Sequence, residues 1–145
     1  MDHPLLRPLP GRDYMLSITR IVVGLCYLQH GMQKHFQFPP TTARPPEFLS
    51  LYWFAGTIEM TCGILLVLGL LARPAAFIAA GEVACAFWIA HWPRGIYPAV
   101  NGGTLVVVYC FTFLLLFFMG PGPISLDRLI FGRKDGMDAQ PAAAE

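Results

Sequence analysis

The stretch GTIEMTCGILLVLGLLARPAAFIAAGEVACAFWIAHW, residues 56–92, decides the fold because it contains two apolar runs joined by a short turn. A helix needs about 20 mostly apolar residues to cross the hydrocarbon core of a bilayer. The runs 51–71 and 74–92 have this length. Pro74 stands where a helix can begin, since the first helical turn needs no backbone N–H from it. The short GLLARP turn predicts that the two helices form an antiparallel hairpin.

The rest of the chain has the same apolar character. Of its 145 residues, 55% are hydrophobic and 13% are charged, whereas about 25% are charged in an average soluble domain. Two further apolar runs cover residues 13–31 and 101–119. We therefore expect one all-α domain over residues 1–145, an integral-membrane four-helix bundle with antiparallel neighbours. A disordered tail is expected at 132–145.

The charges outside the apolar runs predict the orientation and narrow the partners. Loops on the cytoplasmic side of a membrane carry an excess of Lys and Arg. The net charge of +1 argues against nucleic acid as a partner. The apolar runs make the lipid bilayer the predicted partner. One side of the bundle would carry Arg7, Arg12, Arg73, Arg128, Arg133 and Lys134, and the other Lys34, Arg44 and Arg94. Six basic residues on the first side against three on the second predict that the first side, which holds both termini, is cytoplasmic (N-in, C-in).

Three charged residues fall inside the apolar runs: Arg20, Glu59 and Glu82. A charge at the centre of a membrane helix costs about 2.5–3.5 kcal/mol on insertion scales, so it should face the protein interior and find a partner. A helical rise of about 1.5 Å per residue puts Arg20 and Glu82 at similar depths near the cytoplasmic surface. We therefore predict a buried Arg20–Glu82 ion pair. Such charges either fix the packing alone or take part in function, and the sequence leaves both readings open.

A second polar group is predicted near the outer surface. Glu59 enters the membrane from that side, and polar residues at the ends of the neighbouring runs lie at the same level. This cluster is the candidate ligand site, and no residue can be assigned a catalytic role. Its members are Gln29, His30, Glu59, His91 and Asn101.

The cysteines and the known motifs point to no cofactor. The four cysteines, Cys26, Cys62, Cys85 and Cys110, occur one per run and form no CxxC pair. Buried cysteine usually behaves as a small hydrophobe, so no metal site is expected. Nucleotide-binding and haem-binding patterns are also missing from the sequence. No cofactor is therefore predicted by motif, and the motifs do not decide whether the chain is an enzyme.

Several segments together resemble the DoxX family of small four-helix bacterial membrane proteins. They are Arg20, QHGMQK (29–34), GTIEMTCGILLVLGLLARPAA (56–76), GEVACAFWIAHWPRGIYPAVNGG (81–103) and GPGPISLDRL (120–129). Cys62 is a departure, because the family more often has glycine there. The resemblance implies a multi-pass protein of the inner membrane. It also implies a link to membrane redox complexes, such as a thiosulfate:quinone oxidoreductase subunit and assemblies that handle oxidative stress.

Three functions are compatible with these residues. The first is a redox-associated subunit whose interior polar cluster contacts a quinone or a partner oxidoreductase. A quinone site needs an apolar slot with a few polar groups, which His30, Glu59 and His91 would supply. The second is a non-catalytic structural or docking subunit. The third is a small carrier that works as a homo-oligomer.

Overall fold

The computed structural model describes residues 10–132, and this part of the chain is helical with no strand. The prediction of an all-α fold is confirmed. The tail expected at 132–145 lies outside the described residues from position 133 onward. The helices are α1 (Arg12–Phe36), α2 (Leu51–Leu68), α3 (Ala72–Ala86), the π-helical turn η2 (Phe87–His91), the 3-10 turn η3 (Trp92–Arg94), α4 (Pro98–Asn101), α5 (Thr104–Met119) and α6 (Leu126–Phe131).

The helix ends differ from the predicted ones for local reasons. α1 continues past the expected end at Gly31 to Phe36. α2 ends at Leu68 because Gly69 follows in the left-handed conformation, with φ +67°. The last run was expected to begin at 101, but Asn101 ends the separate short helix α4. The sequence pattern also did not reveal α6.

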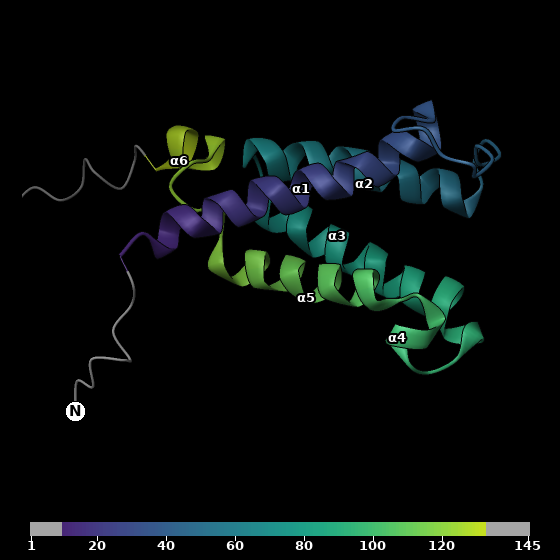
Figure 1. The fold of residues 1–145 in the computed structure, drawn as a ribbon. Helices are drawn as coiled ribbons and strands as arrows, with labels where there is room; N and C mark the ends of the chain where they lie inside the picture. Colours follow the sequence, from purple (N-terminus) through teal and green to yellow (C-terminus); the bar gives the residue numbers. More distant parts are fainter. Residues whose placement is uncertain (1–9, 133–145) are drawn as a thin grey trace, which may run out of the picture.

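The helices pack as two close pairs, α1 with α2 and α3 with α5, and α2 also contacts α3 (Figure 1). Small side chains permit the close approach of α3, since five of its alanines are buried. Tyr27, Leu66 and Phe113 supply the largest apolar side chains at the centre, and each is at most 1% exposed. The buried alanines of α3 are Ala72, Ala75, Ala76, Ala79 and Ala80.

Many large apolar side chains point outward from the helices. A water-soluble protein rarely exposes so many large apolar side chains, whereas lipid tails accommodate them. By length and composition, two helices of residues 10–132 can cross a membrane, Leu51–Leu68 and Ala72–Arg94, and Thr104–Met119 is apolar but shorter. α1 is long enough but more polar. The exposed apolar residues include Val22 and Leu25 of α1, Ile64 of α2, Phe77 and Ile78 of α3, and Val108, Phe111, Leu115 and Phe118 of α5.

Arg20 fixes the end of the molecule where α1 begins and α5 ends. Its side chain is completely buried and donates to main-chain carbonyl oxygens from two other segments. Nε donates to Pro121 O at 2.9 Å, and one terminal nitrogen donates to Val67 O at 3.1 Å. Further bonds go to the carbonyl oxygens of Leu66 and Ile124. Arg20 therefore ties α1 both to the end of α2 and to the segment after α5.

Asp127 completes this end of the fold. Its carboxylate accepts hydrogen bonds from the N–H groups of Leu71 and Ala72 at 2.7 and 2.9 Å, which caps the start of α3. Its own N–H donates to Gly69 O at 2.9 Å. The N–H of Ile124 donates to Ser17 Oγ at 3.1 Å. The segment after α5 is therefore bonded both to α1 and to the turn between α2 and α3.

The predicted Arg20–Glu82 ion pair is wrong. The guanidinium group of Arg20 donates its hydrogen bonds to main-chain carbonyl oxygens. Glu82 accepts a hydrogen bond from Tyr27, which lies seven residues further along α1 than Arg20. Seven residues of helix span about 10 Å, so Arg20 and Glu82 lie at different levels. The similar depths estimated for Arg20 and Glu82 therefore did not imply a contact between them. The segment after α5 occupies the space beside Arg20 and accepts its hydrogen bonds.

Candidate functional site

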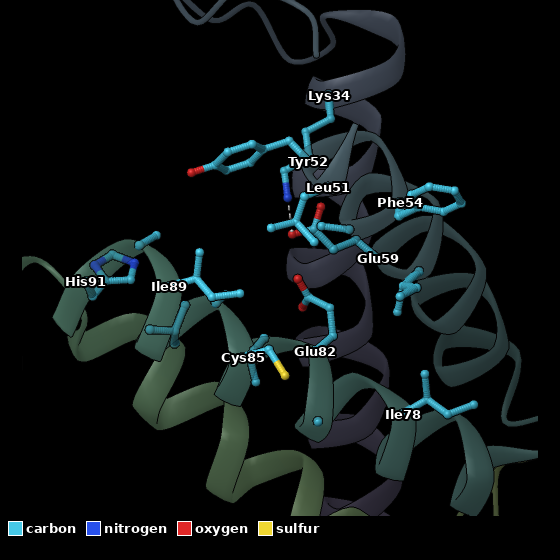
Figure 2. Close-up of a pocket in the computed structure, with 17 residues that line it drawn as sticks. Lys34, Leu51, Tyr52, Phe54, Glu59, Ile78, Glu82, Cys85, Ile89 and His91 are labelled. Atoms are coloured by element: carbon cyan, nitrogen blue, oxygen red, sulfur yellow. Dashed lines mark hydrogen bonds and ion pairs between the residues drawn. The ribbon is translucent and has the colours of Figure 1, made fainter. Parts of the chain in front are cut away.

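A groove of about 480 Å³ lies between α2 and the continuous α3–η2 helix. We call it the carboxylate groove, because Glu59 of α2 and Glu82 of α3 line it (Figure 2). Most of its other lining is apolar, and several of these side chains are also exposed on the outer surface of the helices. The groove therefore joins a polar interior to the apolar surface. Its apolar walls include Leu51, Phe54, Ile58, Ile78, Ile89 and Val106.

Glu59 forms an ion pair with a lysine at the end of α1. Lys34 Nζ lies 2.7 Å from Glu59 Oε1, and the two side chains are 28% and 9% exposed. The other carboxylate oxygen, Oε2, is buried and has no hydrogen-bond partner among residues 10–132. A buried acceptor without a donor is costly, by about 1–3 kcal/mol. This oxygen marks the place where a ligand can supply a missing hydrogen bond.

Glu82 has its own partner on α1. Tyr27 Oη donates to Glu82 Oε2 at 2.9 Å, and Tyr27 is 1% exposed. Its ring lies edge-on against Phe113, with ring centroids 4.8 Å apart, which fixes the direction of the hydroxyl group. The carboxyl groups of Glu82 and Glu59 point toward one another across the groove (Figure 2). Two carboxylates and one lysine thus meet in an apolar surrounding.

Sequence reasoning missed Tyr27 and Lys34, although the sequence contains a signal for both. Arg20, Tyr27 and Lys34 are spaced by seven residues, so they follow one face of α1. Gly24 and Gly31 lie on the same face and are buried against α2. A glycine-lined helix face that also carries a tyrosine and a lysine indicates polar contacts to a closely packed neighbour.

Gly81 leaves an open place in the wall of the groove. It lines the groove beside Glu82, and a Cβ atom built there would meet nothing within 4 Å among residues 10–132. Gly81 is helical, with no positive φ that would require glycine. Glycine inside a helix often marks the close approach of a ligand to the backbone. A Cβ atom at this position would therefore occupy open space at the edge of the groove.

A second, smaller cavity of about 230 Å³ lies beside the groove. We call it the histidine cavity, because His30 of α1 and His91 of η2 both line it. Glu59 and His91 line the cavity and the groove alike, so they stand between the two. The structure therefore places His30, Glu59 and His91 of the predicted outer cluster around one cavity. Tyr27 and Tyr109 complete its polar lining.

The position of His91 depends on an irregular helix end. The π-helical turn η2 carries His91, and its ring stacks on Phe87 with an interplanar angle of 18°. Such turns inside helices are frequent at functional sites. His91 Nδ1 lies 3.2 Å from the carbonyl oxygen of Asn101. A carbonyl oxygen only accepts, so in the neutral ring the proton is on Nδ1 and Nε2 is an acceptor.

Two members of the predicted outer cluster have other surroundings. Asn101 is buried, but its side chain is engaged by Gly95 O and by Gly103 N, each at 2.7 Å, so it shapes the loop that supports His91. Gln29 is exposed and lines none of the cavities described here. One residue along a helix turns the side chain by about 100°, so Gln29 points away from the face that carries His30.

The cysteines contribute no metal-binding group among the described residues. Within residues 10–132, no three His, Cys, Asp or Glu side chains lie close enough together to bind a metal ion. All four cysteines are free; Cys62 is buried and Cys85 lines the carboxylate groove.

The chain also matches known proteins. A family model, DoxX, matches residues 15–92, which is more than half of the chain and includes Lys34, Glu59 and Glu82. The chain belongs to the DoxX family. It is therefore a DoxX family membrane protein, and the resemblance of its motifs is confirmed.

A relative in Haemophilus influenzae (strain ATCC 51907 / DSM 11121 / KW20 / Rd) is 37% identical over 125 residues. The match covers 83% of this chain and 93% of the relative, which is described as an uncharacterized protein. No solved structure matches the chain.

Proposed function

We propose that this DoxX protein crosses the bacterial inner membrane four times and binds a quinone-type headgroup in the carboxylate groove. α1, α2, α3 with η2, and α5 would be the four spans of an antiparallel bundle with both termini in the cytoplasm. The Arg20 end, together with Arg73 in the first turn of α3 and Arg128 of α6, would then face the cytoplasm. The groove and the histidine cavity would lie toward the outer surface.

The observation that carries the proposal is the buried, unpartnered Glu59 Oε2 at the polar end of an apolar groove. Ligand sites for small molecules are mostly apolar clefts with a few well-placed polar groups. A quinone fits this pattern, because its isoprenoid tail belongs among lipid tails and its ring carries two oxygen atoms. The isoprenoid tail would leave the groove between the walls that are exposed to lipid. The quinone ring would bind at the end of the groove that carries the carboxylates.

The redox role would lie with a partner. Neither the motifs nor the described residues supply an electron carrier, so electrons would pass between the bound quinone and a partner oxidoreductase subunit. The contribution of this chain would be to bind the ring and to exchange protons with its oxygen atoms through Glu59 and Glu82. The chain would be a quinone-binding subunit of a membrane redox complex.

The test is the quinone content of the purified protein. The protein is expressed in a bacterium, purified in a mild detergent, extracted with organic solvent, and its quinones are quantified by mass spectrometry. We expect co-purified quinone at close to one molecule per protein. Gly81→Phe should lower this content at least tenfold, since the phenyl ring would fill the groove.

Ile64→Phe is the matched control, because Ile64 is an exposed residue of α2 that lines none of the described cavities. It should leave the quinone content unchanged. A folded protein that contains no more quinone than an unrelated membrane protein would contradict the proposal and favour a structural or docking subunit. Equal loss in both variants would also contradict it, because the loss would then not depend on the groove.

A further inference from the structure

We infer that Tyr52 and Lys34, which we call the donor pair, bind one carbonyl oxygen of the quinone ring in the carboxylate groove. This inference rests on the proposed function, because it assumes that a quinone-type ring occupies the groove. It adds the residues that orient the ring, and it follows from hydrogen-bond donors that the protein leaves unused. A carbonyl oxygen only accepts hydrogen bonds and has two lone pairs, so two donors can bind the same oxygen.

The hydroxyl group of Tyr52 is the first of these donors. Tyr52 lies in the first turn of α2 and lines the groove, and its ring extends from α2 toward the wall formed by α3 and η2 (Figure 2). The residue is 56% exposed, and no hydrogen bond within residues 10–132 engages its hydroxyl group. This hydroxyl group can therefore donate to a ligand without giving up a bond to the protein.

The ammonium group of Lys34 is the second donor. It has three N–H bonds, of which one is directed to Glu59 Oε1 at 2.7 Å. The other two have no acceptor among residues 10–132, and Lys34 lines the groove from the last turns of α1. A charged donor makes a stronger hydrogen bond to a carbonyl oxygen than a neutral donor does. Lys34 can therefore bind a ligand and keep its ion pair with Glu59.

The two donors lie at the same end of the groove. Among the described residues, only Tyr52 and Lys34 line both the groove and a pocket of about 560 Å³ at the loop between α1 and α2. They therefore stand where the groove meets this loop. Glu59 follows Tyr52 by seven residues, so both lie on one face of α2. The polar end of the groove thus combines donors with carboxylates.

The donor pair would set the position of the ring beside Glu59. Apolar walls alone let a flat ring slide and turn, whereas a few well-placed polar groups fix its orientation. Lys34 Nζ lies 2.7 Å from Glu59 Oε1, so a carbonyl oxygen bound to Lys34 is brought close to this carboxyl group. When the ring takes up two electrons from the partner subunit, each of its oxygen atoms takes up one proton. The donor pair therefore holds one of these oxygen atoms beside a group that can exchange protons with it.

The test measures the carbonyl stretching frequencies of bound quinone, because a hydrogen bond to a carbonyl oxygen lowers this frequency. The purified protein is stripped of endogenous lipid in detergent and loaded with a short-chain ubiquinone. Infrared difference spectra between unlabelled ubiquinone and ubiquinone with ¹³C at its carbonyl carbons separate the quinone bands from those of the protein. We expect at least one carbonyl band at a lower frequency than in detergent without protein.

Tyr52→Phe is the diagnostic variant, because it removes the hydroxyl group and keeps the ring. It should raise the lowered frequency part of the way toward the free value, since Lys34 still donates. The quinone affinity, measured by calorimetry, should fall about three- to tenfold, which corresponds to the loss of one hydrogen bond. The unfolding temperature without quinone should be unchanged. Tyr97→Phe is the matched control, because Tyr97 is 71% exposed and lines none of the described cavities.

The outcomes separate this inference from the proposed function. Bound quinone with the same carbonyl frequencies and affinity in Tyr52→Phe as in the unchanged protein would overturn the donor pair and leave the quinone site. An equal change in Tyr97→Phe would also overturn it. Complete loss of the frequency shift in Tyr52→Phe would overturn the part assigned to Lys34. If the protein binds no ubiquinone, both the donor pair and the proposed quinone site are overturned.

Discussion

Tyr27 of α1 and Glu82 of α3 are joined by a hydrogen bond of 2.9 Å, which links two helices that belong to different close pairs. Lys34, one heptad further along α1, makes the corresponding contact with Glu59 of α2. α1 therefore supplies a partner to each of the two carboxylates at the groove. The polar end of the groove depends on three helices, so its geometry should respond to changes in any of them.

Tyr27→Phe should lower the stability of the protein by about 1–2 kcal/mol, because Glu82 Oε2 loses its donor. The measurement is thermal unfolding in detergent, with Tyr14→Phe as the control, since Tyr14 is 60% exposed. A double-mutant cycle of Tyr27→Phe with Glu82→Leu should show coupling. The cycle of Arg20→Met with Glu82→Met should instead be additive within about 0.5 kcal/mol. Coupling between positions 20 and 82 would show that the observed partners are wrong.

Gly69→Ala and Gly81→Ala should have opposite effects. A Cβ at Gly69 would lie 2.6 Å from Ser125 Cβ and 2.8 Å from Arg20 Cζ, and the left-handed backbone alone costs about 1–2 kcal/mol. A Cβ at Gly81 would meet nothing within 4 Å in the described part of the chain, so alanine should stabilise α3 by about 0.5–1 kcal/mol. Thermal melts of both variants check this. Equal destabilisation by the two alanines is the result that would refute it.

Lys34→Met should destabilise the protein by about 1–3 kcal/mol, because Glu59 stays buried and loses its cation. The loss should be smaller than for a fully buried pair, since Lys34 is 28% exposed. Adding Glu59→Gln to Lys34→Met should recover most of the stability, as it removes the uncompensated charge. The comparison uses unfolding midpoints of the single and double variants. A double variant less stable than either single one would argue against the ion pair.

Substituted-cysteine labelling tests the proposed orientation. In a background without the four native cysteines, Thr42→Cys should react with a membrane-impermeant maleimide on intact spheroplasts. Arg128→Cys should react only after permeabilisation, because α6 would face the cytoplasm. Both positions are exposed in the structure, so a failure to react reports the side of the membrane. The reverse pattern would invert the proposed topology.

The apolar runs, together with the Pro and Gly residues at their ends, predicted the helices. Both the length of a run and the positions of Pro and Gly are local properties of the chain. The hairpin of 51–71 and 74–92 corresponds to α2 and α3 with its extension, and the predicted all-helical fold was confirmed. The partners of the buried charges could not be predicted in this way. They depend on how far one helix is displaced along another, and the segment after α5 takes up the donors of Arg20.

The candidate site was predicted in part for the same reason. His30 and His91 lie in the later parts of α1 and η2, and Glu59 lies in the first half of α2, yet all three line one cavity. Gln29 does not join them, because one step along a helix changes the face. The π-helical turn that carries His91 leaves no signature in the hydrophobic pattern of the sequence. Tyr27 and Lys34 could have been identified from their seven-residue spacing with Arg20. Their partners, Glu82 and Glu59, could be identified only from the packing of the helices.

The most direct test of the proposed quinone site is photoaffinity labelling with a ubiquinone analogue that carries an azido group on its ring. After irradiation, the protein is digested and the modified peptides are identified by mass spectrometry. Binding in the carboxylate groove predicts labels on residues 51–59 of α2 and 78–91 of α3 and η2, lost in Gly81→Phe and retained in Ile64→Phe. Labels confined to the lipid-facing side of α5, or unchanged by Gly81→Phe, would contradict it.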